Sequence, residues 1–300
     1  MTKKLYHKLI RDRIPEIIER DGKDYQIRQL RGDDLTRYDT CGIDTHKDAD
    51  ITIKKRATHE EYDGSFPNLK RKLNFHDQEV YVVLCGAGKI SGGSLRLTEQ
   101  LQSHDNIITV IYIQPDCSLL STVQQMQEQV VRNVLQEYAR SGKLKAIWLI
   151  NNEHVEKGIG NVPILGYYDV LNQAIVNTIH MINVFSNSEP VIGNFMSPGT
   201  LSRIATVGIL DIEKGQEKWF SHLTQARDVV YYYGVNEQDL EEDGTLFNQI
   251  TSYVKSQLQD GINVSYGVFK TTYDQKYCYC IKYSSMVQSY GELLDDQDIG

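Results

Sequence analysis

The sequence has few of the features that mark several large classes of protein. Its 300 residues contain only five cysteines, at 41, 85, 117, 278 and 280, and this odd, irregular set indicates free thiols in a reducing cytosol rather than a disulfide framework. The two closely spaced cysteines lack the partner His or Cys that a metal site needs, so we predict no metal site made of protein side chains alone. No apolar run is long enough for a membrane span, and the segment 1–8 has no signal-peptide core. We therefore expect a cytoplasmic protein without membrane contact.

An excess of basic residues is also missing. There are 32 Lys and Arg against 40 Asp and Glu, which gives a formal net charge of −8. Direct, sequence-independent nucleic-acid binding needs a basic face, so we expect no direct nucleic-acid binding from this composition. Phosphate ligands remain open, because backbone N–H groups and a metal ion often hold them. The balance of 40% hydrophobic and 24% charged residues is ordinary for a globular chain, and 300 residues predict two domains.

Three continuous apolar runs are typical of strands buried on both faces, as in a parallel sheet: 79–84, 107–113 and 146–150. A helix between the last two has apolar residues at spacings of three and four, namely Leu119, Val123, Met126, Val130, Val131, Val134, Leu135 and Tyr138. Strands that alternate with helices predict an α/β fold with a doubly wound layer.

A second helix, predicted over 164–185, is apolar nearly all round, which indicates burial nearly all round. We interpret it as a central helix that is buried between two domains and joins them. After a Pro- and Gly-rich loop, the pattern predicts a βαβαββ unit with strands at 206–212, 228–233, 262–269 and 277–283, and helices at 216–225 and 246–258.

The Gly-rich loop 85–94 follows a predicted strand and precedes a predicted helix, an arrangement that aims backbone N–H groups at an anion. It fails as a P-loop because Ile90 follows Lys89, and as a dinucleotide fingerprint because residue 91 is serine. A Gly-rich turn without a ligand is the other interpretation. Residues 88–94 resemble, in a degraded form, the Gly-Gly-Gly-Thr-Gly-Ser/Thr-Gly phosphate loop of the tubulin/FtsZ superfamily.

Other segments resemble that superfamily in order and spacing. Residues 113–118 are similar to its strand followed by Arg-Pro-Phe-Ser, 149–153 to its Ile-Pro-Asn-Asp, the helix 164–185 to its central helix, and 190–197 to the loop after that helix. The resemblance covers about residues 42–290 and implies a tubulin/FtsZ-like two-domain body. We expect an N-terminal arm or divergent first unit (1–41), a nucleotide-binding-type domain (42–162), a central helix (163–187), an activation-type domain (188–290) and an acidic tail (291–300).

The resemblance also implies a site for GTP or GDP with Mg²⁺. Its phosphate-cradling residues would be Gly86, Gly88, Ser91, Gly92 and Gly93. Tyr168 stands where the family has the aromatic that stacks on guanine, Asn172 is placed to bond the base edge, and Asn152 would line the sugar pocket. The alternatives are that Tyr168 is a core residue, Asn172 a polar helix position and Asn152 a turn cap.

The family's catalytic loop carries two aspartates three residues apart, and the matching positions here are Asn194 and Ser197. Neither side chain can act as a carboxylate base. The resemblance implies head-to-tail stacking of identical copies, with a possible adaptor protein, and a role in positioning phage or plasmid DNA. A non-hydrolysing structural or assembly relative is the alternative hypothesis.

The N-terminal segment 5–30 resembles a different family, the MazG-like nucleotide pyrophosphohydrolases, through Leu-Tyr-His-Lys-Leu-Ile-Arg-Asp-Arg-Ile-Pro-Glu-Ile-Ile at 5–18. That class binds Mg²⁺ with a Glu-Glu-x-x-Glu helix, because carboxylates one turn apart can share the ion. After Glu60 and Glu61 the completing position is Gly64, so the metal-binding pattern is not continued. Nucleotide pyrophosphohydrolysis is the third hypothesis.

Overall fold

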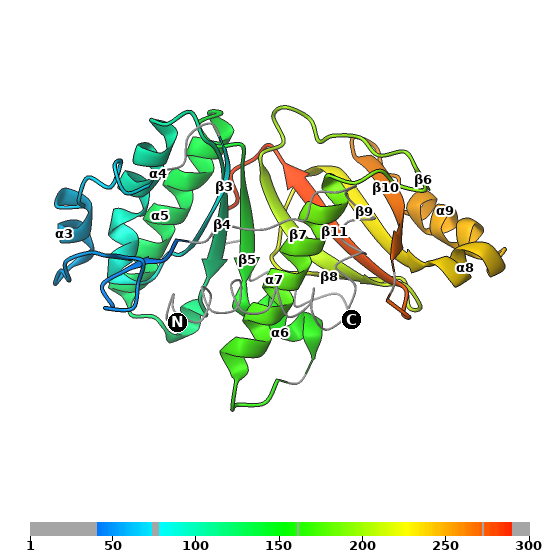
Figure 1. Cartoon of the computed structure of the whole chain (residues 1–300), viewed down its shortest axis with the longest axis horizontal. Helices are drawn as coiled ribbons and strands as arrows, with labels where there is room; N and C mark the ends of the chain where they lie inside the picture. The colour runs from blue at the N-terminus through cyan, green and yellow to red at the C-terminus, as the bar shows by residue number, and fades with distance from the viewer. Residues whose placement is uncertain (1–40, 74–77, 161, 272, 290–300) are drawn as a thin grey trace.

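The computed structural model describes residues 41–73, 78–160, 162–271 and 273–289 (Figure 1). The segment that resembles MazG-like enzymes, nearly all of the predicted N-terminal arm and the acidic tail lie outside the described residues. The fold is a mixed α/β body built on one long sheet, with helices on both faces. No helix among the described residues is long and apolar enough to cross a membrane.

Within the described residues the main sheet has nine strands, in the order β3-β4-β5-β7-β11-β9-β10-β6, with β8 paired to β7. The first three strands are β3 (Glu79–Cys85), β4 (Ile107–Gln114) and β5 (Ala146–Asn151), and they run parallel. They coincide with the three predicted apolar runs. In β4 and β5 almost every side chain is buried, as expected for strands covered on both faces.

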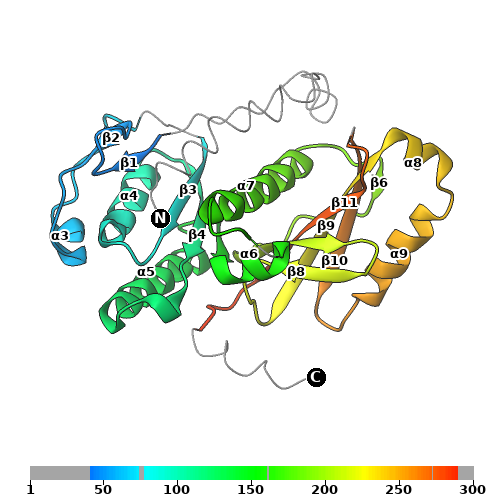
Figure 2. The same cartoon turned by 90° about the horizontal axis from the view of Figure 1, so that it is seen from below.

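Helices cover the two faces of this first part of the sheet (Figure 2). α4 (Ser94–Gln102) and α5 (Thr122–Arg140) share a core with one face, to which β4 contributes Ile108 and Val110. α7 (Tyr167–Ser186) packs on the other face, against Ile111 and Ile150. The shorter α6 (Asn152–Ile159) connects β5 to α7.

The predicted buried helix is confirmed over most of its length, because α7 packs on both parts of the sheet. Leu171 and Ile175 share a core with β5, and Phe185 stacks on Phe269 of β10 with 4.5 Å between ring centroids. The prediction was wrong at the start. Gly166 has φ of +79°, so the helix begins at Tyr167, and Ile164 lies outside it and is exposed.

The second part of the sheet contains β7 (Ile204–Asp211), β9 (Ala226–Asn236), β10 (Asn263–Thr271) and β11 (Tyr277–Ser284), with the edge strand β6 (Ile192–Gly193). β9 and β10 are parallel, whereas β11 is antiparallel to both β7 and β9. α8 (Glu237–Glu242) and α9 (Leu246–Ser256) connect β9 to β10.

The predicted helix at 216–225 is wrong, and with it the strict βαβαββ order. Residues 216–219 form strand β8 (Gln216–Trp219), which returns along β7 in an antiparallel hairpin. Gly215 has φ of +62°, a conformation that supports the tight turn. The apolar residues at 219, 220 and 223 fit a helical spacing, but the hairpin pairing decides the local structure.

Before β3 the chain forms a small two-stranded sheet and a short helix, whose apolar side chains join the core of α4 and α5. β1 (Ile43–Asp44) and β2 (Ile51–Thr52) pair in parallel, and α3 (His59–Gly64) follows them. Short 3-10 turns follow two strands of the main sheet, at Lys89–Gly93 and Cys117–Leu119. β3 stands at one end of the main sheet, and no strand of the described residues pairs with its outer edge.

Candidate functional site

The loops after β3, β4 and β5 meet at one edge of the sheet, because the three strands run parallel and in register. Cys85 stands opposite Ile113, and Gln114 stands opposite Asn151. The Asn151 amide donates to the Gln114 side-chain oxygen at 3.2 Å, which joins the last two loops. Open α/β sheets place ligands at such an edge. The structure therefore brings the predicted loop 86–93 and Asn152 to the same side of the molecule.

The Gly-rich loop is folded tightly on itself. The Ser91 hydroxyl lies 2.6 Å from the carbonyl oxygens of both Gly86 and Gly88, to which it can donate its hydrogen. Ser91, Gly92 and Gly93 are buried in the 3-10 turn. The Ser91 hydroxyl, which was predicted to meet a phosphate, is thus already engaged within the loop.

Three of its four glycines are required by packing. A Cβ atom at Gly86 would lie 1.7 Å from the Tyr112 hydroxyl, and one at Gly92 would lie 2.0 Å from the backbone oxygen of His59. At Gly93 the obstacle is the Phe66 ring, at 2.3 Å. Gly88 alone is open, because a Cβ atom there would lie 3.8 Å from Ile90 Cγ2, an ordinary van der Waals distance. At these three glycines the space beside Cα is filled by the protein's own chain.

We expect Gly92→Ala to lower stability by roughly 1–3 kcal/mol, since the new methyl group would push α3 off the loop. Thermal unfolding would measure the loss. Gly88→Ala is the matched control, because its backbone has φ of −81° and space for a Cβ. Equal melting temperatures for the two variants would contradict this account of the loop.

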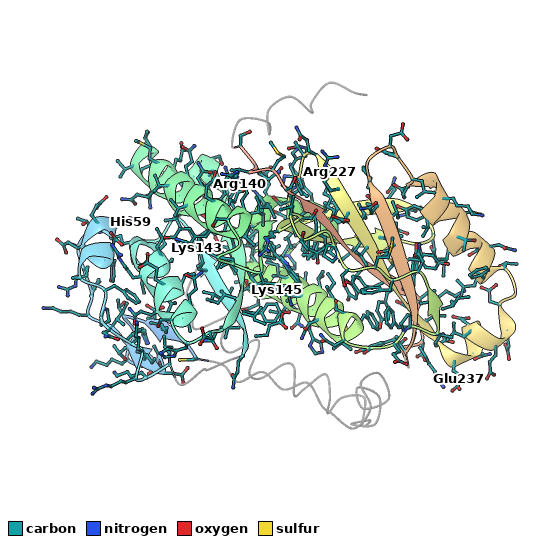
Figure 3. All side chains as sticks on the ribbon, turned by 90° about the horizontal axis from the view of Figure 1, so that it is seen from above. His59, Arg140, Lys143, Lys145, Arg227 and Glu237 are labelled. Atoms are coloured by element: carbon teal, nitrogen blue, oxygen red, sulfur yellow. The ribbon has the colours of Figure 1, made fainter. Side chains whose placement is uncertain are left out.

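His59 begins α3 and packs on the loop (Figure 3). Its Nε2 atom is buried without a hydrogen-bond partner. Burial lowers the pKa of His59 from its ordinary value of 6.5, against the opposite effect of Glu60 and Asp63. The folded protein therefore favours the neutral imidazole, whereas the unfolded chain takes up the proton near pH 6.5.

The stabilising effect of neutral His59 is fully present above about pH 6.5 and is lost as the pH falls toward its lower folded pKa. We expect the melting temperature of the wild type to fall more steeply between about pH 7 and pH 5 than that of His59→Gln, which cannot titrate. Calorimetry at a series of pH values measures this. Parallel curves for the two proteins would exclude His59 as the source.

A buried polar group that was not predicted from the sequence lies under the loop. The Tyr112 hydroxyl donates to Glu128 Oε1 at 3.0 Å, and Arg132 Nε lies 3.7 Å from the same oxygen. Glu128 is fully buried, and burial raises its pKa above the ordinary value. An acid and a base four residues apart on a helix are the signal that could have found the pair. They fix the floor of the loop beneath Gly86.

Asn151, and not Asn152, caps the turn after β5. Its side-chain oxygen accepts hydrogen bonds from the N–H groups of Glu153 at 2.8 Å and His154 at 3.3 Å. Asn152 is buried, and its side-chain oxygen has no hydrogen-bond partner. The interpretation of Asn152 as a cap is therefore wrong, and an unpaired acceptor stands at the edge of the sheet where β3, β4 and β5 end.

The start of α7 carries the two residues expected to meet a base. Tyr168 is 49% exposed and packs edge-on against Tyr167, at 5.2 Å between ring centroids, so it is not a core residue. Asn172 is fully buried, with neither its side-chain nitrogen nor its oxygen hydrogen-bonded. Such an amide is expensive to bury, and each unpaired group in a folded protein requires an explanation.

Asn194 and Ser197 lie at the other end of α7, about 30 Å from its start given a length of 20 residues. Both are exposed. The Asn194 side-chain oxygen accepts a hydrogen bond from the Tyr266 backbone N–H at 2.9 Å. The backbone N–H of Asn194 donates to the Tyr266 carbonyl oxygen at 3.0 Å. Asn194 therefore extends the β6–β10 pairing, and the chain does not bring the predicted catalytic positions to the loop 86–93.

Exposed apolar side chains flank both ends of α7, a feature that sequence analysis did not identify. Before the helix, Ile164 and Leu165 are 93% and 91% exposed. After it, Val191 is 62% and Met196 50% exposed, with Phe195 beside them. We call these residues the two α7 ends. Contiguous exposed apolar surface marks a contact site.

Metal-binding side chains do not gather in the part of the chain that the structure describes, where no group of three or more His, Cys, Asp or Glu could hold an ion.

Solved structures share this architecture. An empty FtsZ dimer from M. jannaschii superposes with a TM-score of 0.54 at 11% identity, over 81% of this chain and 79% of that one. The GTPγS-form protofilament of Bacillus thuringiensis serovar israelensis TubZ gives 0.54 at 16% identity, over 81% and 75%. A helical model of a TubZ-Bt four-stranded filament gives 0.54 at 17%, over 77% and 65%.

The fold is that of FtsZ and TubZ. The predicted tubulin/FtsZ-like two-domain fold, with a largely parallel sheet, is confirmed. No protein-family model and no curated protein matches the sequence. The FtsZ-type fold is thus carried by the order of strands and helices around α7, at identities too low to transfer function.

Proposed function

We propose that this protein is a cytoskeletal subunit whose copies stack head to tail into filaments through the two α7 ends. The observation that carries the proposal is the pair of exposed apolar groups at opposite ends of one rigid helix. Contact between one end and the opposite end of the next copy is heterologous and does not close, so it generates a filament. Apolar contact of this kind needs no charged ligand between the subunits.

The structural relatives support the proposal. The FtsZ structure is of a dimer, and the TubZ structures are of a protofilament and a filament. Residues 42–162 and 188–290 are the two bodies of each subunit in this proposal, and 163–187 join them. A further TubZ structure is of a plasmid segregation protein. Positioning of plasmid or phage DNA through an adaptor protein is the role we propose for the filaments, since the acidic chain is unsuited to direct DNA contact.

Assembly without family-type GTP hydrolysis is part of the proposal. Asn194 and Ser197 offer no carboxylate, and Asn194 is engaged with Tyr266. The engagement of the Ser91 hydroxyl with the Gly86 carbonyl oxygen, and the packing of Gly86, Gly92 and Gly93 against the protein's own chain, support this part of the proposal.

A second candidate function is binding of a nucleotide base without catalysis. The unpaired amide of Asn172 and the unpaired oxygen of Asn152 offer the donor and acceptors that a guanine edge and a sugar require. Tyr168, half exposed one turn before Asn172, offers a ring for stacking. Any such nucleotide would be held by its base rather than by its phosphates.

Light scattering, pelleting and electron microscopy with GTP, with GDP and without nucleotide test both candidates, with phosphate release as a parallel readout. We expect filaments in all three conditions and no phosphate release above background. Filaments only with GTP, together with phosphate release, would contradict the assignment of a non-hydrolysing subunit. Absence of filaments in every condition would overturn the function itself.

A further inference from the structure

We propose that two runs of basic side chains at one end of the molecule form a docking site for an acidic segment of a partner protein. The runs are residues 54–56 and 70–72, the only places in the sequence where three consecutive residues are Lys or Arg. One run precedes α3 and the other follows it, in the part of the chain drawn in shades of blue at the left of Figures 1 and 2. We call these runs the two basic triads, and their members are Lys54, Lys55, Arg56, Lys70, Arg71 and Lys72.

Buried neighbours in the chain fix both triads at the protein surface. Ile53 precedes the first triad, and Leu69 and Leu73 flank the second, and all three are buried in the core of α4 and α5. The side-chain amide of Gln100 on α4 accepts a hydrogen bond from the Leu69 N–H at 2.6 Å and donates one to the Pro67 carbonyl oxygen at 3.0 Å. Five of the six basic residues are exposed, and the sixth is half-buried. The charges therefore stand on a packed support and face solvent.

The six basic side chains form no ion pair with any residue that the structure describes. Basic residues elsewhere in the molecule differ from them in this respect. A carboxylate oxygen lies within 2.9 Å of the side-chain nitrogen in each of Arg96, Arg140, Lys157 and Lys276. The positive charge of the triads is thus not neutralised within the subunit, although the chain has a formal net charge of −8. It is available to an anionic group of another molecule.

The acidic residues nearest in the chain are engaged elsewhere. Glu60 of α3 and Glu99 of α4 reach toward α5, where their carboxylates contact the side chains of Gln127 and Tyr138. Because α3 separates the two triads along the chain, its carboxylates confine the positive surface to two short stretches. The site is therefore suited to a small anionic segment rather than to an extended polyanion.

The surroundings of the triads favour an acidic protein segment over the two other common anionic partners. A DNA duplex carries about one negative charge per 1.7 Å of its axis, so it would extend beyond the triads over a chain of net negative charge. Stable membrane binding needs apolar insertion besides charge, and no large apolar side chain is exposed in the described segments 41–73 and 78–106. Clusters of basic residues bind short acidic motifs in many recognition domains.

The inference rests on the proposed function in one respect, because the adaptor protein of the filament is the partner that carries the acidic segment. The triads lie in the chain before β3, whereas the α7 ends lie at 164–165 and 191–196, so docking leaves the filament contacts free. Surface charges attract weakly and are screened over about 8 Å at physiological salt, so one segment binds one subunit weakly. A filament presents the site once per subunit, and an adaptor with several acidic segments gains avidity from this repetition.

Fluorescence anisotropy on free subunits at low salt tests the site, with a labelled peptide of alternating Glu and Ser as the probe and its Gln–Ser counterpart as the neutral control. We expect the wild type to bind only the acidic peptide. Glutamine in place of all three residues of either triad should weaken binding about tenfold or more. The matched control is Lys157→Gln, Lys214→Gln, Lys255→Gln, which removes the same charge from exposed positions and should leave the affinity within about twofold. Equal affinities of triad and control variants, or a loss confined to one triad, would overturn the proposal.

The same titration with duplex DNA and with phosphatidylserine vesicles tests the class of partner. We expect both to bind more weakly than the acidic peptide at the same salt concentration. Tighter binding of either one, lost in the triad variants, would overturn the choice of a protein segment. Subunits are kept below the concentration at which they pellet, so the result does not depend on filaments. Peptide binding without filaments at any concentration would retain the site and reject the proposed function, whereas filaments without peptide binding would reject the site alone.

Discussion

Replacement of both Ile164 and Leu165 by aspartate should abolish head-to-tail assembly while leaving the fold intact. Both side chains are more than nine-tenths exposed, so the charges cost nothing in the free subunit. In the filament the same carboxylates would be enclosed against apolar residues of the next copy, and burial of an unpaired charge costs several kcal/mol. We expect the concentration needed for assembly to rise by at least about a hundredfold. Pelleting over a range of concentrations measures the change.

The opposite end gives a matched experiment. Met196→Asp places a carboxylate at the other α7 end and should block assembly as strongly. Each variant keeps one functional end, so a mixture of the two should form dimers that neither forms alone. Leu258→Asp, at a comparably exposed residue of α9's flank, is the control and should assemble normally. Assembly of the Ile164→Asp, Leu165→Asp protein at the wild-type concentration would exclude the α7 ends as the contact.

Asn172→Leu should raise thermal stability and abolish binding of any guanine nucleotide. The buried Asn172 amide has no hydrogen-bond partner, and an apolar residue of similar volume removes that cost. The gain should be about 1–3 kcal/mol, which corresponds to a rise of a few degrees in melting temperature. The same substitution removes the group proposed to bond the base edge. Calorimetry and fluorescence titration with a labelled guanine nucleotide give the two readouts.

Thr178→Val separates stability from binding. Thr178 is also fully buried on α7 with an unpaired hydroxyl, but it lies six residues farther along the helix. The valine variant should gain stability without any change in nucleotide affinity. If Asn172→Leu lowers the melting temperature, the amide has a stabilising role in the fold. If its affinity for guanine nucleotides equals that of the wild type, the base-binding proposal fails.

The predictive power of the sequence differed between elements for a physical reason. β4, β5 and most of α7 were predicted because elements that are covered on both faces are mostly apolar, and this leaves a continuous apolar pattern in the sequence. The segment 216–225 was mispredicted because its apolar spacing fitted a helix. Residues 216–219 form a strand because they pair with β7, and the spacing of apolar residues within one segment cannot predict a contact with another segment.

The candidate site shows the same limit. The Gly-rich loop was correctly placed after β3, but glycine is compatible with close approach of a phosphate or of the protein's own backbone. In the structure, the His59 backbone and the Phe66 ring fill the space beside Gly92 and Gly93. Asn172 was singled out by its place on the predicted helix, whereas its complete burial without a partner depends on how the helix packs.

The sequence by itself determined the acidic, cysteine-poor character of the chain and the α/β order of elements around one buried helix. Composition and continuous apolar runs are properties of the chain alone. Only the tertiary structure decided which apolar residues are left for contact with other molecules. On α5 both faces carry apolar side chains, and the sheet covers only one of them, which leaves Val123 and Met126 exposed. An apolar side chain favours burial, and the fold determines whether it is buried within the same chain or left exposed for contact with another molecule.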